Sequence, residues 1–410
     1  MNSLYAFTCF LFFFLTLLVF YTYLGYGLVA WILVKTRRRL NMVPQRPVIQ
    51  PGTPLDVTVV VPAYNELAYL PAKLQNCLDQ DYPAEHLHLL FVIEGSTDGS
   101  AEYLERMQAT IPNLTIISGS RRLGKIEAMN NVMKQVKTPI TIFTDANTQL
   151  NTQAVSRLMK RFEVENVGAV TGEKRISTHA SESAAGSGEG LYWRYESFLK
   201  RLDAELHTIV GAAGELFAIR TDLYEPVESD TLLDDFMISL RIAGRGYRVE
   251  YEPNAYALER PSHSVREEMK RKVRIATGGF QSIYRLAYLL NFFKYGWLSF
   301  QYVSHRVLRW AVTPFCLPLL LLLNVVILIQ QYTFGTDPAT VSFWWAILLL
   351  QTSFYLMAYT GYILESRQTR WKVAFVPFYF VFMNWCVLLG FARYCQGNIS
   401  GVWEKAQRAQ

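Results

Sequence analysis

The two ends of this 410-residue chain are strongly apolar, and this is the feature that most limits what it can fold into. Residues 4–34 are almost entirely apolar. Three further apolar runs follow near the C-terminus, at about 310–331, 343–364 and 373–392. Each run is long enough to cross the hydrocarbon core of a bilayer, which takes about 20 residues. We therefore expect an integral membrane protein with an anchor at 1–36 and about three transmembrane helices within 310–394.

We expect the first apolar run to be a retained anchor. A signal peptide has an apolar core of roughly 7–15 residues, and residues 4–34 form a run about twice that length. The run is followed by KTRRR, residues 35–39. Basic residues beside an apolar run mark the cytoplasmic side, where anionic lipids attract them. These features predict a protein of the cell membrane, inner or plasma, with the middle of the chain in the cytoplasm.

The connections between the C-terminal runs leave a conflict. Residues 332–342 contain no Lys or Arg, whereas ESRQTRWK, residues 365–372, contains three. This difference places the first connection outside and the second inside. Three crossings from a cytoplasmic domain would leave the tail, 395–410, outside, although it carries Lys405 and Arg408. Either the last run is re-entrant, or these two charges do not decide the topology.

Residues 284–303 are apolar but are interrupted by Arg285 and Lys294. Such a pattern is typical of helices that lie in the membrane interface rather than cross it. We therefore expect interfacial amphipathic helices at 284–309.

The middle of the chain reads as an α/β domain. Residues 37–55 predict a proline-rich linker. Strands are then expected at 57–61, 87–94, 114–118 and 139–147. Helices are expected at 70–80, 101–109 and from 125 to about 137. This alternation predicts a mainly parallel sheet with helices on both faces, in a domain that covers 56–283. The small, polar residues 177–190 predict a mobile loop.

Polar residues gather where the expected strands end, at 65–66, 94–98 and 145–147. Ligands bind at the carboxyl ends of strands in open α/β sheets. Asp145 closes the strand ITIFT, so its carboxylate would face the ligand. A divalent cation prefers such oxygen ligands. A turn-forming aspartate is an equally open interpretation.

Asp234 and Asp235 precede a helical pattern. Acidic residues stabilise a helix N-terminus, so capping is one interpretation. The other is a general base that removes a proton from a hydroxyl group. Two adjacent carboxylates would also perturb each other's pKa.

Three more segments are suited to an anionic or closely bound ligand. Arg271 and Arg274 are three residues apart on an expected helix, and guanidinium groups match phosphate oxygens. Lys125 follows a glycine at an expected helix start, where phosphate binds. Small residues in GAAGELFAIR, 211–220, allow close backbone approach. The alternatives are membrane-facing charge, a solvated basic loop and simple packing, respectively.

Charge and cysteine content exclude some classes of protein. The formal net charge of +6 is modest, and the basic clusters at 35–39 and 270–274 fit a membrane flank and a phosphate site. Nucleic-acid binding is therefore not expected. The five cysteines include no CxxC pair, so neither a zinc site nor a disulfide framework is indicated. Cys77 alone lies in the middle region, which fits a reducing compartment.

Seven motifs occur in a telling order: VPAYNE, EGSTDGS, RRLGKIEAMN, TDAN, GAAGELFAIR, LLDDF and RKVRI. In this order, over roughly residues 57–280 and with apolar runs at both ends, the chain resembles glycosyltransferase family 2. It is most similar to the membrane-integrated branch with the cellulose, hyaluronan, chitin and poly-N-acetylglucosamine synthases. The resemblance implies a Rossmann-like GT-A fold, a nucleotide-diphosphate sugar donor, usually a UDP-sugar, a divalent metal (Mg²⁺ or Mn²⁺) and displacement with inversion.

The resemblance also implies roles for individual residues. The donor-binding residues would be Glu66, Glu94, Asp98, Lys125, Asp145, Arg271 and Arg274. The catalytic pair would be Asp235, as the base, and its neighbour Asp234. Asp145 and Asn147 would hold the metal, and Gly211, Gly214 and Glu215 would line the acceptor site.

The chain departs from the family pattern at three positions. The second metal-site carboxylate is replaced by the amide of Asn147, which would weaken metal binding. Asp234 stands where the family has a glutamate. Ile275 stands where the synthases have a tryptophan that contacts the acceptor sugar. The last change argues more against processive polymer synthesis than against sugar transfer.

The main hypothesis is therefore an inverting hexosyl- or N-acetylhexosaminyltransferase that acts on a growing polysaccharide or another membrane-associated acceptor. An alternative is addition of a single sugar to a lipid. A third is a catalytically silent, membrane-anchored binding subunit. A transporter is disfavoured because no expected span has a charged residue near its centre. The expected partners are the nucleotide-sugar, the acceptor and membrane lipids, with either accessory export subunits or a homo-oligomer.

Overall fold

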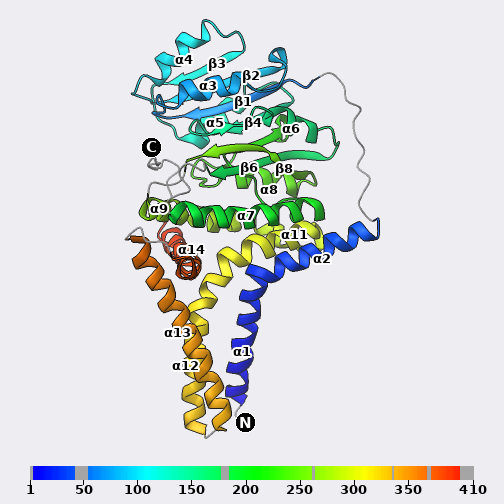
Figure 1. The fold of residues 1–410 in the computed structure, drawn as a ribbon. Helices are drawn as coiled ribbons and strands as arrows, with labels where there is room; N and C mark the ends of the chain where they lie inside the picture. The colour runs from blue at the N-terminus through cyan, green and yellow to red at the C-terminus, as the bar shows by residue number, and fades with distance from the viewer. Residues whose placement is uncertain are drawn as a thin grey trace.

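The computed structural model of the protein describes residues 3–41, 54–176, 184–260, 264–334, 337–366 and 371–397. Figure 1 shows an α/β domain seated on a layer of helices, from which a group of long helices extends away. Most of the linker at 37–55 and of the tail at 395–410 lies outside the described residues.

The α/β domain is built on one eight-stranded sheet with the order β3-β2-β1-β4-β7-β6-β8-β5. The strands are β1 (Val57–Ala63), β2 (Leu87–Glu94), β3 (Leu114–Gly119), β4 (Ile140–Thr144), β5 (Gln149–Leu150), β6 (Val167–Ile176), β7 (Leu216–Arg220) and β8 (Arg248–Glu259). β1 to β4 pair in parallel, and β6 pairs in parallel with β8. β7 runs antiparallel to both of its neighbours. The expected mainly parallel sheet is confirmed.

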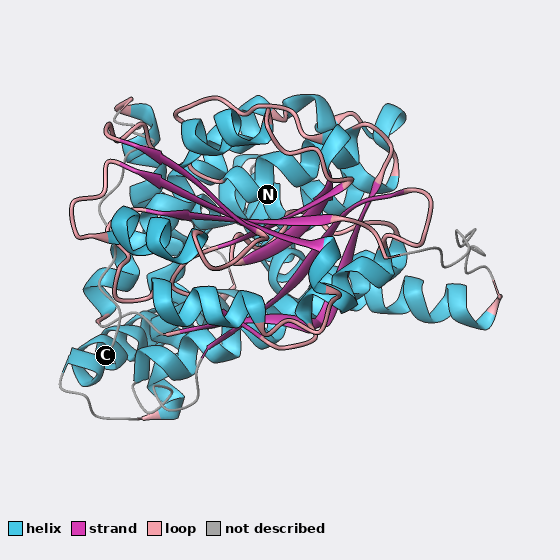
Figure 2. Ribbon diagram, turned by 90° about the horizontal axis from the view of Figure 1, so that it is seen from above, coloured by secondary structure: helices cyan, strands magenta, loops and turns pink. Residues whose placement is uncertain are grey.

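Helices cover both faces of this sheet (Figure 2). They are α3 (Leu70–Leu78), α4 (Ser100–Gln108), α5 (Lys125–Met133), α6 (Ala154–Arg161), α7 (Ala184–Leu206), α8 (Asp234–Gly244) and α9 (Val265–Arg285). The apolar sides of α3, α4 and α6 pack against one face, and those of α5 and α8 pack against the other. Strands with apolar side chains on both faces need such a double cover, and the result is the expected three-layer GT-A arrangement.

The membrane region comprises α1 (Ser3–Phe20), the π-helical η1 (Tyr21–Gly25), α2 (Tyr26–Arg39), η5 (Ala287–Leu290), α10 (Phe292–Tyr295), α11 (Trp297–Tyr302), the π-helical η6 (Val303–Val312), α12 (Thr313–Phe334), α13 (Pro338–Ser366) and α14 (Lys372–Cys395). Four continuous helical segments are long and apolar enough to cross a membrane: Ser3–Arg39, Trp297–Thr333, Pro338–Glu365 and Val373–Cys395. The four expected apolar helices are thus present. The second of them begins well before residue 310, inside the region expected to be interfacial.

The N-terminal helix bends and serves two partners. Its first half, α1, packs on α12 around Phe12, Leu15 and Ile327. Its second half, α2, turns away beneath the α/β domain, as Figure 1 shows, and packs Tyr26 and Ala30 on α7. The change of direction follows the π-helical segment η1, and such segments are a common cause of kinks.

The last helix, α14, takes a different course from the other apolar helices. Figure 1 shows α1, α12 and α13 extending together, whereas α14 is seen almost along its axis, beside α9. The two helices are in close contact because Gly390 has no side chain, and a Cβ atom there would lie 2.5 Å from the Cβ of Ala276. Thr277 also donates a hydrogen bond to the Gly390 carbonyl oxygen at 3.2 Å. The final apolar run therefore contacts the α/β domain through α9, and it also packs on α13, where a Cβ atom at Gly361 would lie 2.4 Å from the Ala374 carbonyl oxygen.

One expectation is wrong in part. Residues 177–190 were expected to form a mobile loop, but helix α7 already begins at Ala184. Residues 177–183 lie outside the described part of the chain. The helix is stabilised by tertiary contacts, since Leu199, Leu202 and Leu206 pack on α2.

Candidate active site

Three neighbouring strands bring the polar clusters of the sequence to one edge of the sheet. β1 lies between β2 and β4, and all three run in parallel. Their carboxyl ends lead into residues 64–66, 94–98 and 145–147. The expected convergence of these segments is therefore present.

The turn after β4 is fixed from beneath by a buried lysine. Lys73, on α3, is 1% exposed and donates to Thr144 Oγ1 at 2.9 Å and to the Thr148 carbonyl oxygen at 3.0 Å. The Thr148 hydroxyl group donates to the carbonyl oxygen of Asp145 at 2.8 Å. These contacts hold the turn, so the Asp145 carboxylate, which is 34% exposed, is presented to the open side.

Lys125, at the start of α5, lies between two carboxylates. Its Nζ atom is 3.2 Å from Asp145 Oδ1 and 3.4 Å from Asp234 Oδ2. Burial lowers the pKa of Lys125, but the charges of Asp145, Asp234 and Asp235 outweigh that effect and raise it above its usual value. The lysine is therefore charged at any physiological pH and joins β4, α5 and α8 in one cluster.

The pKa of the Asp235 carboxyl group is raised into the neutral range. Burial, the adjacent Asp234 and the nearby Glu215 together raise its pKa to about 7, although Lys125 acts in the opposite direction. Gly214 leaves space on one side, where an added Cβ atom would lie 3.2 Å from Asp235 Oδ2. A carboxylate with a pKa near neutrality is suited to accept a proton.

Helix α9 contributes the two arginines. Arg271 makes two contacts with Glu268, from Nε to Oε2 at 3.1 Å and from Nη2 to Oε1 at 3.2 Å. Arg274 interacts electrostatically with Asp234, Asp145 and Asp235, whereas burial and Arg271 lower its pKa. Arg274 is thus part of the carboxylate cluster, and Arg271 stands beside it, held by Glu268.

The GAAGE segment, residues 211–215, makes close packing contacts and one buried ion pair. Gly211 has a φ of 101°, and an added Cβ atom would lie 2.4 Å from the Phe236 ring, so close packing accounts for it. Glu215 is paired with Lys174 at 2.6 Å, and Lys174 also contacts Glu259. Burial opposes ionisation of Glu215, but Lys174 lowers the pKa of Glu215 to about 2. Of the three residues expected at the acceptor site, Gly214 lies next to Asp235, and the charge of Glu215 also acts on Asp235.

The remaining donor candidates lie on the loops after β1 and β2. Asn65 adopts a φ of 53°. Its side-chain Oδ1 atom accepts a hydrogen bond from the Thr97 backbone amide at 2.8 Å, and its backbone amide donates one to the Ser96 hydroxyl oxygen. Asp98 accepts from the amides of Leu67 and Ser100, so its carboxylate ties the two loops together.

Two glutamates lie where these loops begin, with Glu94 as the last residue of β2. Glu94 accepts from the Leu123 amide, and burial raises its pKa. Glu66 follows β1, and its carbonyl oxygen accepts from the Tyr69 amide at 2.8 Å. Glu94 thus contacts the segment that leads into Lys125.

Two important residues escaped sequence reasoning. Lys73 lies on the apolar side of α3, and Lys174 lies inside the buried strand β6. A lysine among apolar residues is itself a signal, because a buried lysine is rare unless it is paired. Neither residue belongs to a recognisable motif, so the sequence alone did not single them out.

The oxygen ligands available in the site fit a hard cation that is bound together with a substrate. Among the described residues no group of three His, Cys, Asp or Glu side chains could hold a metal ion by itself. Asp145 and Asn147 share one turn and offer a carboxylate and an amide oxygen. Mg²⁺ is commonly bound by one or two carboxylates together with substrate phosphates, and this sparse set matches that pattern.

Comparison with known proteins identifies relatives of the α/β domain. Residues 58–227 match the family model "Glycosyl transferase family 2". Poly-β-1,6-N-acetyl-D-glucosamine synthase of Staphylococcus aureus is 24% identical over 237 residues, 56% of this chain and 56% of that protein. Glycosyltransferase AglE of Haloferax volcanii is 24% identical over 231 residues, 55% of this chain and 73% of that protein.

A solved structure shares the fold over almost the whole chain. It is the mannosyltransferase PcManGT from Pyrobaculum calidifontis in complex with GDP-Man and Mn²⁺, with a TM-score of 0.68 and 22% identity. The match covers 94% of this chain and 98% of that one, so it includes the apolar helices as well as the GT-A domain. The chain spans about half the length of the S. aureus synthase it matches. Residues 58–227 thus form a domain of glycosyltransferase family 2, within a chain that shares its overall fold with this mannosyltransferase.

Proposed function

We propose that the protein transfers a hexosyl or N-acetylhexosaminyl group from a nucleotide-diphosphate sugar, with inversion, to an acceptor at the membrane. The observation that carries this proposal is one cluster at the carboxyl ends of the strands. Lys125 contacts Asp145 and Asp234, and Asp235 lies next to them with a pKa raised to about 7. Cations for a diphosphate and a base for a hydroxyl group are thus within one site.

Asp235 would accept the proton of the attacking acceptor hydroxyl group. The acceptor oxygen forms a bond to C1 of the sugar while the bond from C1 to the diphosphate oxygen breaks. The proton ends on the Asp235 carboxylate, and the electron pair of the broken bond ends on the nucleoside diphosphate. A single displacement of this kind inverts the configuration at C1.

Lys125, Arg274 and Arg271 would stabilise the negative charge that develops on the leaving diphosphate. Such stabilisation by fixed, preorganised groups is usually the largest contribution to catalysis. A divalent cation, Mg²⁺ or Mn²⁺, held by Asp145 and Asn147, would add Lewis-acid neutralisation of the same charge. Because one protein carboxylate is replaced by an amide, we expect the cation to be bound mainly with the donor.

The nucleoside would lie against the loops of Glu66, Glu94 and Asp98. The identity of the donor is open between two chemistries. The S. aureus relative is named for N-acetylglucosamine, which favours a UDP-sugar, whereas the PcManGT structure contains GDP-mannose. We favour a UDP-hexose or UDP-N-acetylhexosamine because the family that the motifs resemble usually takes a UDP-sugar and the S. aureus relative is named for N-acetylglucosamine.

The position of the site favours an acceptor that arrives from the membrane side. Trp310, on η6, packs on Phe236, the residue after Asp235, with ring centroids 5.2 Å apart. Helix α9, which carries Arg271 and Arg274, lies along the apolar α14. A growing polysaccharide and a membrane lipid are both compatible with this position. The basic residues in the last turn of α2 favour the cytoplasmic face of the cell membrane for the catalytic domain.

The test is a donor screen on the detergent-purified protein with membrane extract, Mg²⁺ or Mn²⁺, and UDP- and GDP-sugars. The expected result is release of nucleoside diphosphate with one donor, lost when a chelator removes the metal. Sizing the product separates the acceptors, because a ladder means polysaccharide synthesis and a single lipid-soluble product means lipid glycosylation. No release with any donor would overturn the proposal in favour of a silent binding subunit, which then acts with an accessory subunit or a second copy.

A further inference from the structure

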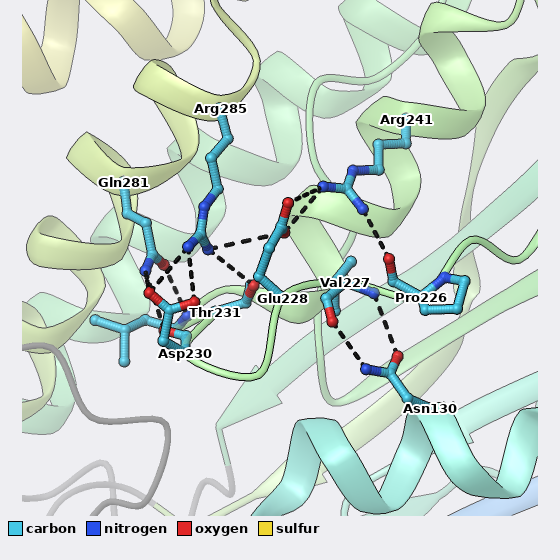
Figure 3. A network of polar contacts seen from close by, with 10 residues as sticks. Asn130, Pro226, Val227, Glu228, Asp230, Thr231, Arg241, Gln281 and Arg285 are labelled. Atoms are coloured by element: carbon cyan, nitrogen blue, oxygen red, sulfur yellow. Dashed lines mark hydrogen bonds and ion pairs between the residues drawn. The ribbon is translucent and has the colours of Figure 1, made fainter.

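The segment that leads into the catalytic aspartates has no regular secondary structure, yet it is tightly held. It covers residues 224–233, between the 3-10 turn η4 (Thr221–Leu223) and α8. Figure 3 shows side chains from three helices that reach its backbone. A segment without a ladder of backbone hydrogen bonds must satisfy its polar groups in another way. Here α5, α8 and α9 supply the partners.

The first contact comes from Asn130 on α5. Its Nδ2 atom donates to the Val227 carbonyl oxygen at 2.8 Å, and its Oδ1 atom accepts from the Val227 amide at 3.2 Å. The Tyr224 hydroxyl group also donates to Oδ1 at 2.7 Å. One carboxamide thus binds both polar groups of a single peptide residue. α5 is the helix that begins with Lys125.

The second contact comes from Gln281 on α9, which is 3% exposed. Its Oε1 atom accepts from the Leu232 amide at 3.1 Å, and its Nε2 atom donates to the Asp230 carbonyl oxygen at 3.0 Å. Arg285, one turn further along α9, holds the Asp230 carboxylate at 2.7 and 2.9 Å. α9 is the helix that carries Arg274.

Two more contacts complete the arrangement. Arg241 on α8 donates to the Pro226 carbonyl oxygen at 3.0 Å and to Glu228 at 2.7 Å. Gly278 on α9 approaches the segment so closely that an added Cβ atom would lie 2.7 Å from Leu233 Cγ and 2.8 Å from Leu232 Cβ. The two residues directly before Asp234 are therefore fixed to α9 by both contact and hydrogen bonding.

We infer that Gln281 and Asn130 are positioning residues that set the distance of Asp234 and Asp235 from Lys125 and Arg274. Each helix that contacts the segment also carries charged residues of the active site: Lys125 on α5, Asp234 and Asp235 on α8, and Arg274 on α9. Each carboxamide uses its donor and its acceptor together, so no charged or apolar residue of the same size can replace it. A misplacement of about 1 Å at an active site can cost roughly 100-fold in rate.

The inference rests on the proposed transferase activity, so wild-type turnover is measured first. Without wild-type turnover the proposed function fails, and the positioning role inferred from it is overturned as well. The test variants are Gln281→Glu, which keeps the acceptor and loses the donor, and Asn130→Asp, which makes the same change at the other contact. The matched control is Glu225→Gln, on the same segment, since Glu225 forms an exposed ion pair with Arg245.

We expect each test variant to lower kcat by about 10- to 100-fold, with little change in the KM for the donor. We also expect the acid limb of the pH profile to move to lower pH, because loosening the segment admits water to a carboxyl group whose raised pKa depends chiefly on burial. Gln281→Asn, which keeps the amide on a shorter side chain, should recover part of the rate.

The thermal unfolding midpoint is recorded for each variant, and rates are compared at a temperature where all variants are folded. Wild-type kcat and an unmoved pH profile in folded Gln281→Glu and Asn130→Asp would overturn the inference. A loss of rate in Glu225→Gln equal to theirs would do the same, because the effect would then belong to the segment in general.

Discussion

Burial and two nearby carboxylates raise the pKa of Asp235, and this decides the pH at which it can act as a base. Its pKa is raised to about 7 by burial, by Asp234 and by Glu215. The carboxyl group is therefore protonated, and inactive as a base, below about pH 7. The rate of transfer should rise with pH through this value and then level off.

Replacement of Asp234 by Asn tests this account at the level of one residue. The change removes a negative charge next to Asp235 and leaves Lys125 to act on fewer carboxylates, and both effects lower the pKa of Asp235. We predict that the acid limb of the kcat/KM profile moves to lower pH. The control is Asp222→Asn, an exposed residue of η4. A limb that stays in place, or moves to higher pH, would show that Asp234 does not set the titration of Asp235.

The residues that could be predicted from the sequence are those whose place follows from the end of a strand or the start of a helix. Asp145 follows β4, Asp234 and Asp235 begin α8, and Lys125 begins α5. These positions depend on local patterns, which the sequence displays. Lys73 and Lys174 act through partners 71 and 41 residues away in the chain, and no local pattern announces such a pairing.

At the scale of elements, α7 and η6 are joined by a buried network of charges. Glu196, on α7, contacts Arg306 at 2.5 Å and Arg309 at 3.1 Å, both on η6. His305 lies between Glu196, at 3.4 Å, and Asp203, at 2.6 Å. Burial opposes ionisation of Glu196, but Arg306, His305 and Arg309 hold its pKa well below the usual value. The network fixes the α/β domain to the helix that continues into α12.

Removal of Glu196 should therefore destabilise the protein strongly. Glu196→Ala leaves buried positive charge without its carboxylate, a change that typically costs about 3–5 kcal/mol. The control on the same helix is Glu205→Ala, because Glu205 forms an exposed pair with Arg38, and such pairs contribute roughly 0–1 kcal/mol. Denaturation of both variants in detergent checks the prediction. Equal loss of stability in the two would contradict the role given to the network.

The alternation of strands and helices could be predicted at this scale, and it is confirmed for β1 to β4 and for α3 to α5. The bend between α1 and α2 could not be predicted. The apolar run continues from one helix into the other, and the pattern does not say whether lipid or protein covers each part. The start of α7 was also missed. Its first residues have low helix propensity, and contacts made further along the helix outweigh that preference.

At the scale of the whole molecule, the course of α14 bears on the topology that the sequence left in conflict. α14 lies along α9 instead of extending with α1, α12 and α13 (Figure 1). A helix in this position does not need to carry the tail across the membrane. The tail, with Lys405 and Arg408, would then remain on the side of the catalytic domain, as the distribution of basic residues favours.

Labelling of Cys395 with a membrane-impermeant maleimide tests this prediction. Cys395, at the end of α14, is exposed, whereas Cys77, Cys316 and Cys386 are buried. The reference is a cysteine placed at the exposed Lys160 of the catalytic domain, in a Cys395→Ser background. We predict that the reagent labels Cys395 and this reference cysteine from the same side of the membrane. Labelling of the two positions from opposite sides would show that α14 crosses the membrane.

The most direct test of the account as a whole is the comparison of wild type and Asp235→Asn in donor binding and in transfer, at a pH above 7. The account predicts that both proteins bind the nucleotide-sugar alike in calorimetry, because Asp235 acts on the acceptor hydroxyl group. It also predicts that the variant releases nucleoside diphosphate about 100- to 10,000-fold more slowly, the usual contribution of a general base. Turnover at the wild-type rate in Asp235→Asn would contradict the assignment of the base, and with it the mechanism built around this cluster.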